Sequence, residues 1–367
     1  MLHTRRVFAA GALAAASTPA LAAGPRSDLV EFPFNLARGL PMVSCESGGA
    51  ALPFVLAINA NYFGAHPSVI QLWNTRQGAG RGDPNQYTRE VLIGGALRLP
   101  SHLLRASPRR FEETGAAGLF GLAYYRNYAI DWDRKRVTVG RLDGRGRPGF
   151  EEIPTRRLGT SLPIVEAELD GRKLTLHMVS TISGGVALSA SAVRRLDLWD
   201  AYERRRDEYD HLTGRNTHRV VVGRSLKIGA LEVRRPLVTL LREHGNAVDG
   251  FIGVDMLRRL NIVSTRPSLR MWVAPSGQAD DVQADDRAGL SLVRRSGGYV
   301  AAGLDAAGPA HAAGLRDGDL IVGHEGEGGL DGLAYALTRA AGTEVGILVA
   351  RDDGAPRPMR IVLAERV

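Results

Sequence analysis

The sequence contains a single cysteine, Cys45, among 367 residues. One thiol cannot form a disulfide within the chain, and Cys45 lacks cysteine or histidine partners at the spacing of a metal site. We therefore expect no metal or other cofactor, and we interpret Cys45 as a small apolar strand residue. Aromatic residues are also scarce, at 6%, whereas glycine is abundant, with 44 residues. This combination is typical of a turn-rich β protein rather than a helical bundle.

Lysine is nearly absent, so arginine carries almost all of the positive charge. The lysines are Lys135, Lys173 and Lys227, and the formal net charge is +8. The arginines are scattered in pairs along the chain and are not drawn into one stripe. A nucleic-acid site requires basic groups clustered on one face together with aromatic or base-reading side chains. We therefore interpret the arginines as a solvated surface and expect no nucleic-acid partner.

Long apolar runs are missing as well. No segment approaches the roughly 18 residues that cross a bilayer, so no membrane span is expected. Residues 1–22 instead have the pattern of a cleavable export signal, with TRRVF at 4–8 resembling the twin-arginine motif, a short apolar region at 9–16, and ALA at 20–22 as cleavage site. The alternative is a disordered tail. As a signal, the segment predicts a bacterial periplasmic or secreted protein, and it leaves the Tat or Sec route and the oligomeric state open.

One glycine pattern occurs twice. Residues 118–130 (GLFGLAYYRNYAI) and 250–262 (GFIGVDMLRRLNI) each begin with two glycines that enclose two apolar residues, followed by a short amphipathic turn and an apolar strand. Glycines at this spacing suit a strand that passes close to another backbone. The pattern predicts the same local structure at both places.

The repetition extends upstream of these glycines. Residues 40–43 (LPMV) match 162–165 (LPIV), Gly48 matches Gly171, and the stretch FVLAINA from residue 54 is aligned with HMVSTIS from residue 177. The repeat is more than a hundred residues long, which is too long for a solenoid or propeller unit. We therefore expect two copies of one β-rich unit, at about 40–140 and 162–273, with a cleft between them.

At these positions the chain resembles the aspartic proteases in the bacterial retropepsin-like or pepsin-like form, with both lobes on one chain. Each lobe of that family has a strand that ends in Asp-Thr-Gly and a Gly-apolar-apolar-Gly strand crossing behind it. The resemblance implies a mainly β fold, a bilobal aspartic-protease-like β-barrel domain with lobe 1 at 29–141 and lobe 2 at 158–275. It places Ala57 and Ser180 at the two catalytic aspartate positions.

The replaced residues remove the chemistry of the family. Aspartic proteases use two adjacent carboxylates that share one proton, so that one activates water while the other donates to the scissile carbonyl. Alanine has no titratable atom, and the Ser180 hydroxyl needs a base. His177 lies three residues earlier, where strand alternation places it on the opposite face. The resemblance therefore implies no catalytic residue at Ala57 or Ser180.

Other carboxylates lie near the expected cleft in the sequence, at Asp83, Asp249 and Asp255. We expect Asp255 to be solvated or to cap the turn after its glycine pair. The polar stretches 74–85 and 200–219 occupy positions that the family gives to flap hairpins, although plain loops would have the same composition.

The C-terminal part resembles a second family. After an acidic linker at 276–286, residues 308–321 (GPAHAAGLRDGDLI) closely resemble the Pro-Ala, Ala-Gly-Leu and Gly-Asp-apolar-Ile signature of bacterial PDZ domains. The resemblance implies an α+β PDZ domain at 287–367, in which a helix at 330–341 forms one wall of a peptide groove. The implied peptide-binding residues are Gly289, Leu290, Ser291, Leu292, Leu333 and Leu337, with the two helical leucines facing the groove or the core.

Three functions are compatible with the sequence. The first is an exported, catalytically inactive protein that binds peptides or proteins through the PDZ groove, for instance at a C-terminal carboxylate, with the vacant cleft as a second candidate site. The second is an active aspartic endopeptidase with non-standard carboxylates. The third is an assembly role, with the PDZ domain docking an envelope partner. The two changed acid positions favour the first function over the second, and the sequence does not separate the first from the third.

Overall fold

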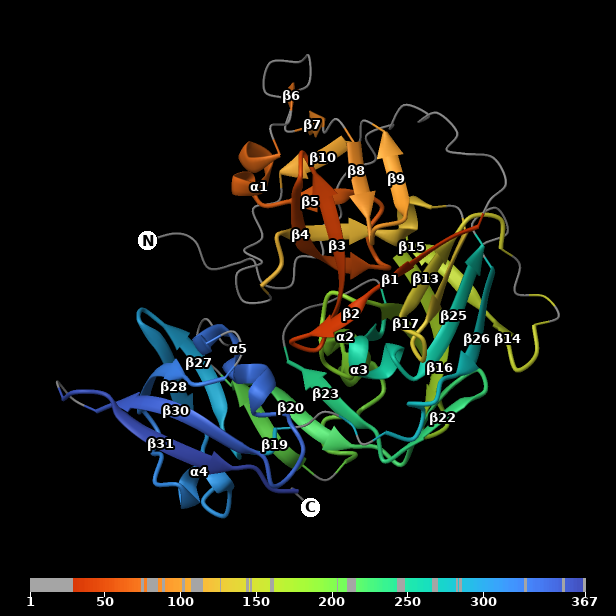
Figure 1. Cartoon of the computed structure of the whole chain (residues 1–367). Coiled ribbons are helices and arrows are strands. Elements are labelled where there is room, and N and C mark those ends of the chain that lie inside the picture. The colour runs from red at the N-terminus through yellow and green to blue at the C-terminus, as the bar shows by residue number, and fades with distance from the viewer. Residues whose placement is uncertain are drawn as a thin grey trace.

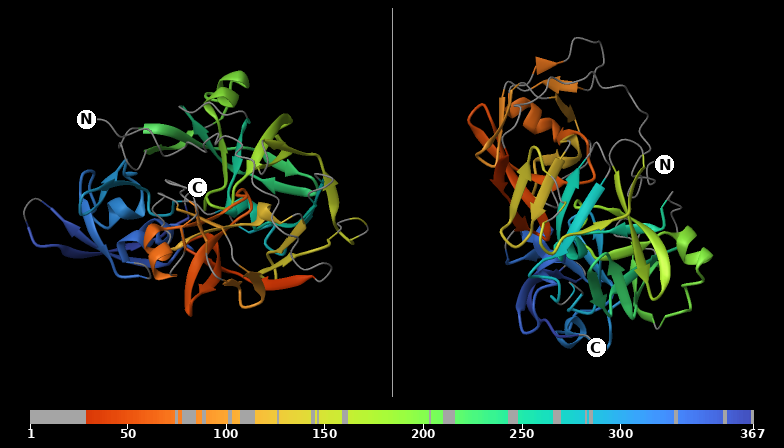
Figure 2. Two further views of the ribbon diagram at one scale, coloured as in Figure 1. Left: turned by 90° about the horizontal axis from the view of Figure 1, so that it is seen from above. Right: turned by 90° about the vertical axis from the view of Figure 1, so that its right-hand side faces the viewer.

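The computed structural model describes the chain from residue 29 onward, with internal gaps. The described residues are 29–73, 76–77, 85–87, 90–100, 103–106, 115–125, 127–142, 145, 147–158, 162–202, 204–209, 216–242, 248–265, 270–281, 283, 286–326, 329–351 and 354–365. The expected export signal and Asp83 lie outside them. Two β lobes and a C-terminal domain lie side by side (Figures 1 and 2). Among the described residues, no helix is long and apolar enough to cross a membrane.

Lobe 1 is built on one curled sheet, which has ten strands within the described residues. Its order is β6-β7-β10-β5-β11-β4-β3-β8-β9, with β2 paired to β3. The bounds are β2 Asn35–Ala37, β3 Leu40–Ser47, β4 Ala50–Ala57, β5 Phe63–Ala65, β6 Arg76–Gln77, β7 Asn85–Tyr87, β8 Glu90–Ile93, β9 Leu97–Pro100, β10 Leu103–Ala106 and β11 Gly118–Gly121, with helix α1 at Pro67–Leu72 and the 3₁₀ turn η2 at Leu122–Tyr124.

Lobe 2 repeats this sheet strand for strand. Its order is β19-β20-β23-β18-β24-β17-β16-β21-β22, with β15 paired to β16. The bounds are β15 Thr155–Leu158, β16 Leu162–Leu169, β17 Arg172–Met178, β18 Val186–Leu188, β19 Arg204–Tyr209, β20 Asn216–Val222, β21 Ser225–Ile228, β22 Leu231–Arg234, β23 Leu237–Leu241 and β24 Gly250–Ile252, with helices α2 Ala190–Arg195 and α3 Val254–Leu257. Both expected flap regions contain a hairpin, β6–β7 in lobe 1 and β19–β20 in lobe 2.

A third sheet joins the lobes (Figure 1). Its order is β1-β13-β12-β25-β26-β14, and the seam is the antiparallel pair β12–β25, where Tyr128 lies opposite Ser264. The bounds are β1 Val30–Pro33, β12 Asn127–Asp131, β13 Arg136–Val139, β14 Glu151–Ile153, β25 Leu260–Thr265 and β26 Arg270–Pro275. Because one lobe supplies β12 and the other β25, the backbone hydrogen bonds of this sheet hold the lobes together.

The repeated glycines lie where two backbones touch. Strand β11 runs parallel to β4 and antiparallel to β5, and β24 runs in the same way between β17 and β18. A Cβ at Gly118 would lie 2.1 Å from the carbonyl oxygen of Gly64, and one at Gly250 would lie 2.2 Å from that of Ala187. The expected close approach of a glycine-containing strand to another backbone is therefore confirmed in both lobes.

The C-terminal domain is a separate α+β unit with its own apolar core. Within the described residues it has a five-stranded antiparallel sheet in the order β27-β28-β29-β30-β31. The bounds are β27 Ser291–Arg295, β28 Gly298–Ala302, β29 Leu320–His324, β30 Glu344–Ala350 and β31 Arg357–Val362, with helices α4 Pro309–Ala312 and α5 Gly329–Ala336. Helix α5 ends five residues earlier than expected, and the chain then turns into β30.

Candidate functional site

The candidate site lies where β4 of lobe 1 and β17 of lobe 2 end beside each other. Ala57 is the last residue of β4, and both it and Ile58 are buried. The end of β17 is followed by Val179 and Ser180, which are also buried. These four residues occupy the place at which the sequence resemblance puts the catalytic aspartates.

Strand register corrects the sequence alignment of the two lobes by one residue. Gly118 pairs with Phe54 and Gly121 with Ala57 in lobe 1, whereas Gly250 pairs with Leu176 in lobe 2. Phe54 is thus equivalent to Leu176, and three residues later Ala57 is equivalent to Val179. The expected equivalence of Ala57 and Ser180 is wrong, because Ser180 corresponds to Ile58.

The hairpin turns before these strands support the corrected register. Gly48 and Gly49 have positive φ values of 59° and 81°, and Asp170 and Gly171 have 51° and 80°. Two successive positive φ values are the signature of a type I′ turn, which joins twisted antiparallel strands in two residues. Gly49, not Gly48, is therefore the counterpart of Gly171, and the same offset applies from this turn to Ser180.

The Ser180 hydroxyl connects the two lobes. Its Oγ donates a hydrogen bond to the carbonyl oxygen of Leu56 over 2.7 Å and accepts one from the backbone N–H of Ile58 over 2.9 Å. Both partners are at least 122 residues away in the sequence. With donor and acceptor positions both used by lobe 1 backbone, the hydroxyl acts as a structural bridge, and among the described residues no base is hydrogen-bonded to it that could make it a nucleophile.

The carboxylates near this point are held by other groups in lobe 2. Asp249 accepts hydrogen bonds from the backbone N–H and the hydroxyl of Thr175, and it forms an ion pair with Arg195. Asp255 is 3% exposed and forms an ion pair with Arg258 at 3.1 Å. Of the two roles expected for Asp255, solvation is wrong; the side chain lies buried in the first turn of α3, whose N-cap is Gly253. Among the described residues, no group of three or more His, Cys, Asp or Glu side chains is placed to hold a metal ion.

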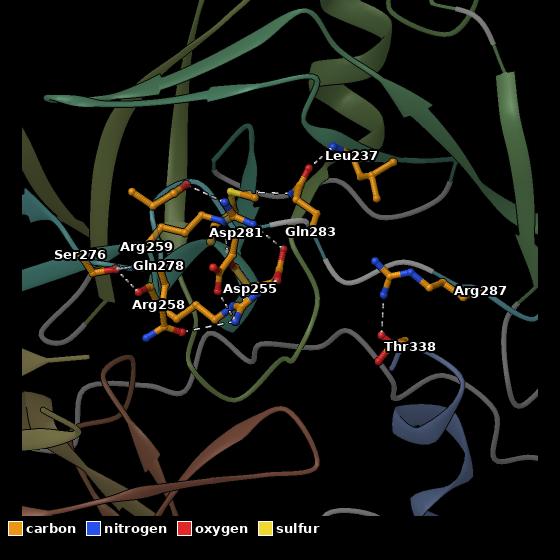
Figure 3. Close-up of polar contacts among 12 residues, drawn as sticks. Leu237, Asp255, Arg258, Arg259, Ser276, Gln278, Asp281, Gln283, Arg287 and Thr338 are labelled. Atoms are coloured by element: carbon orange, nitrogen blue, oxygen red, sulfur yellow. Dashed lines mark hydrogen bonds and ion pairs between the residues drawn. The ribbon is translucent and has the colours of Figure 1, made fainter. Parts of the chain in front are cut away.

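A network that the sequence analysis missed surrounds Asp255 (Figure 3). Arg259 is 1% exposed, lies 3.9 Å from the Asp255 carboxylate, and donates to the carbonyl oxygens of Asp255 and Ala279. Arg258 reaches from Asp255 to Gln278 and Asp281. Burial lowers the pKa of Arg259, and the Asp255 carboxylate opposes that shift. The spacing of Asp255 to Arg258 and Arg259 (i, i+3 and i, i+4) was the available sequence signal.

The expected peptide-binding residues of the C-terminal domain come together, but in its core. Leu290 is 7% exposed, Leu292 5%, Leu333 0% and Leu337 4%, and the four belong to one apolar cluster. Ser291 is half-buried at the start of β27, which is an edge strand of the sheet as described. The two helical leucines therefore face the core, one of the two placements that the sequence left open.

The backbone loop before β27 already binds a carboxylate. Asp286 accepts hydrogen bonds from the N–H groups of Ala288, Gly289 and Leu290 over 2.9 to 3.1 Å. Gly289 has a φ of 80°, which glycine adopts without strain and which lets successive N–H groups converge. Two of these three donors, Gly289 and Leu290, are in the loop expected to receive a C-terminal carboxylate.

Comparison with known proteins finds similar solved structures but no match by sequence. No protein-family model matches the chain, and no curated protein matches it. Similar solved structures include the basic 7S globulin from soybean (11% identity, 71% of this chain and 98% of that chain, TM-score 0.40), an aspartic proteinase from Irpex lacteus (10%, 70% and 100%, 0.47) and a retropepsin-like aspartic protease from Rickettsia conorii (16%, 34% and 90%, 0.27).

The mainly β, bilobal aspartic-protease-like part of the predicted fold class is confirmed. In each lobe the glycine-containing strand, β11 or β24, lies parallel to the strand that ends at the candidate site and antiparallel to the next one. This statement rests on the strand order and register of the two lobes.

Replacing Ser180 by alanine is expected to destabilise the protein by about 1–3 kcal/mol, because the buried N–H of Ile58 and the carbonyl of Leu56 both lose their partner. Urea denaturation measures the loss. Ser180→Thr retains the hydroxyl and should recover part of it, whereas Ser183→Ala, at an exposed serine in the same loop, should change stability little. Equal stabilities of the Ser180→Ala and Ser183→Ala variants would contradict the bridging role.

Because His177 is buried, we expect the folding stability of the protein to decrease in acid. Burial lowers its pKa from an ordinary value of 6.5 to about 4. Below pH 6.5 the unfolded chain binds a proton that the folded chain rejects, so stability decreases as the pH falls from about 6.5 to 4, by on the order of 3 kcal/mol. His177→Val, which copies the equivalent Val55 of lobe 1, should reduce this slope in urea titrations at pH 7, 6, 5 and 4. An unchanged slope would assign the acid sensitivity to other groups.

Proposed function

We propose that this protein is an exported, non-catalytic member of the aspartic-protease-like fold class that binds peptides or proteins. The observation that carries the proposal is the pair of residues at the equivalent strand ends, Ala57 and Val179, neither of which can hold or release a proton. The adjacent Ser180 hydroxyl is used by lobe 1 backbone. An amide cannot be hydrolysed in the manner of this family without two acids at that point.

The strand pairing and hairpins around the candidate site are compatible with binding an extended peptide. The β12–β25 seam and the Ser180 bridge fix the lobes relative to one another, and each lobe retains a hairpin at its flap position. A fixed pair of lobes with backbone edges at the rim can hold an extended chain by main-chain hydrogen bonds without cleaving it.

The C-terminal domain supplies the second part of the proposal. The signature at residues 308–321 favours a PDZ domain, which would receive a peptide along edge strand β27 and its C-terminal carboxylate at the loop before that strand. The converging N–H groups of this loop support the proposal, because they already bind a carboxylate, that of Asp286.

Proteolysis and binding assays test the two parts separately. Unfolded casein should stay intact between pH 3 and 7 under conditions in which pepsin degrades it. Pepstatin-sensitive cleavage would establish instead the alternative, an active endopeptidase. In the binding assay, immobilised peptides with a free C-terminus should retain the full chain better than amidated copies.

Charge variants locate the binding site. Ser291→Asp places a negative charge on β27 and should weaken retention on the free-carboxylate peptides, because like charges repel. Val362→Asp adds the same charge at an exposed position of β31, the opposite edge of the sheet, and serves as the matched control. Equal retention of both variants would exclude the β27 edge.

Export is tested on the full chain in a bacterial host. The proposal predicts a mature periplasmic or secreted protein that begins near Ala23, and N-terminal sequencing of the fractionated protein measures it. Replacing Arg5 and Arg6 by lysine should retain the precursor in the cytoplasm if the twin-arginine route is used. An uncleaved protein in the cytoplasmic fraction would overturn the localisation.

A further inference from the structure

Three surfaces of the C-terminal domain would take part in peptide binding: the loop before β27, the apolar side chains between β27 and α5, and the outer edge of β27. The loop is satisfied internally, because Gly289 and Leu290 donate to the carboxylate of Asp286. A peptide carboxylate would have to displace an aspartate that is tethered only three residues away, which gives the internal group a high effective concentration.

The apolar part is filled as well. Leu292 of β27 and Leu333 and Leu337 of the α5 region are each no more than 5% exposed and pack against one another. Side chains buried to this degree leave no open pocket at their own positions for a ligand side chain. A peptide residue can enter between β27 and α5 only if these elements separate.

The outer edge of β27, on the side away from β28, faces another part of the chain. Residues of β27 lie within 8 Å of residues of β19, measured between Cα atoms, and Figure 1 shows the β19–β20 hairpin of lobe 2 extending to the C-terminal domain. Hydrogen-bonded strands are about 4.8 Å apart, so a peptide strand inserted between β27 and β19 needs about 9.6 Å. At the positions where the two strands approach within 8 Å, the space is too narrow for an added strand.

The linker fastens the domain in this position (Figure 3). Gln283 is 8% exposed, accepts a hydrogen bond from the N–H of Leu237 at the start of β23, and directs its amide to the sulfur of Met256. Asp281 forms an ion pair with Arg258. Gln283 is the last described linker residue with a contact to lobe 2 and lies only eight residues before β27, so the short connection limits how far the domain can move.

We propose that the C-terminal domain is held closed by its own chain: β19 covers the peptide-adding edge of β27, Asp286 occupies the carboxylate loop, and the linker at Asp281 and Gln283 is the latch. Peptide binding then requires release of the domain from lobe 2. The inference rests on the proposed peptide-binding function. A protein whose binding-competent form is a minor population binds its ligand more weakly in proportion to that population.

The test compares the full chain with a latch variant, Asp281→Ala/Gln283→Ala. Arg360→Ala, on the distant strand β31, is the control, because its ion pairs with Glu344 and Glu325 are exposed and lie within the C-terminal domain. The probes are fluorescein-labelled heptapeptides that end in Val, Leu, Ile or Phe, each with a free or an amidated C-terminus. Small-angle scattering of the same samples reports whether the domain is released.

The expected result is a gain of about tenfold or more in affinity for free-carboxylate peptides in the latch variant alone, with a larger radius of gyration. Equal binding by all three proteins, although scattering shows that the latch variant has released its domain, would overturn the closed state as a limit on binding and leave the peptide-binding function intact. No binding by a latch variant whose scattering shows release would overturn peptide binding by this domain. Unchanged scattering together with unchanged weak binding would overturn the role of Asp281 and Gln283 as a latch.

Discussion

Gly250→Ala is expected to cost about 3 kcal/mol or more of folding stability, a large fraction of the roughly 5–15 kcal/mol that keeps an ordinary domain folded. The added methyl carbon would lie 2.2 Å from the carbonyl oxygen of Ala187 and 3.0 Å from the Cα of Leu188. Both atoms are backbone, and β24 is held between β17 and β18 by hydrogen bonds on each side. No side chain can rotate away to relieve the contact, so the sheet itself must separate.

Gly118, the counterpart of Gly250 in lobe 1, provides a second test of this prediction, and Gly184 provides a control. Gly118→Ala places a methyl group 2.1 Å from the carbonyl oxygen of Gly64 and should have an effect of the same size in lobe 1. Gly184→Ala adds the same group where no atom lies within 4 Å, so its stability should stay within about 0.5 kcal/mol of the parent. Guanidinium denaturation followed by tryptophan fluorescence measures all three. A Gly250→Ala variant as stable as Gly184→Ala would show that β24 does not need the close approach.

The glycine pairs were predictable from sequence because their cause is local and steric. Gly118 and Gly250 stand at the same place in two stretches of the same pattern, and only glycine permits a backbone contact of this kind. Glycines also mark the hairpin turns, where Gly49 and Gly171 both have a φ near 80°, although the sequence comparison paired Gly171 with Gly48. Features of this type depend on one residue and its neighbours, so a single sequence reveals them.

The register of β17 could not be read in the same way. The end of the strand nearest the site, Leu176 to Met178, is buried on both faces, so the alternation visible at Lys173 and Thr175 does not continue to the site and cannot fix the alignment there. A shift of one residue therefore aligned Ala57 with Ser180 in place of Val179. The shift moved the hydroxyl from a bridge between lobes to an apparent catalytic position, although both alignments lack the acids.

The linker shows a different limit of the sequence. Its polar, acidic composition at 276–286 predicts a solvated connection between domains. In the structure, Ser276, Gln278 and Asp281 contact Arg258, and Gln283 is buried against lobe 2. A polar segment has the same composition whether it is solvated or hydrogen-bonded to another domain. Only the positions of its hydrogen-bond partners in the structure distinguish the two cases.

Asp255→Ala is expected to be as destructive as the glycine substitutions, at about 3–5 kcal/mol, because it leaves the guanidinium of Arg259 buried without its carboxylate. Burial already lowers the pKa of Arg259, and Asp255 is the leading group that opposes the shift. Arg258 retains exposure and its contact with Asp281, so its own loss is smaller. Thermal or urea unfolding of the variant measures the cost.

The double variant Asp255→Ala/Arg259→Met separates the loss of a buried charge partner from a general loss of packing. Methionine fills much of the space of the arginine stem without its charge, so the double variant should be more stable than Asp255→Ala alone, even though it carries one more substitution. If the free-energy losses of the single variants Asp255→Ala and Arg259→Met simply add in the double variant, the buried Arg259 does not depend on the Asp255 carboxylate. Its hydrogen bonds to the carbonyl groups of Asp255 and Ala279 are then what stabilise it. Because Ala279 belongs to the linker, Arg259→Met should in that case also loosen the C-terminal domain, which small-angle scattering of the single variant would detect.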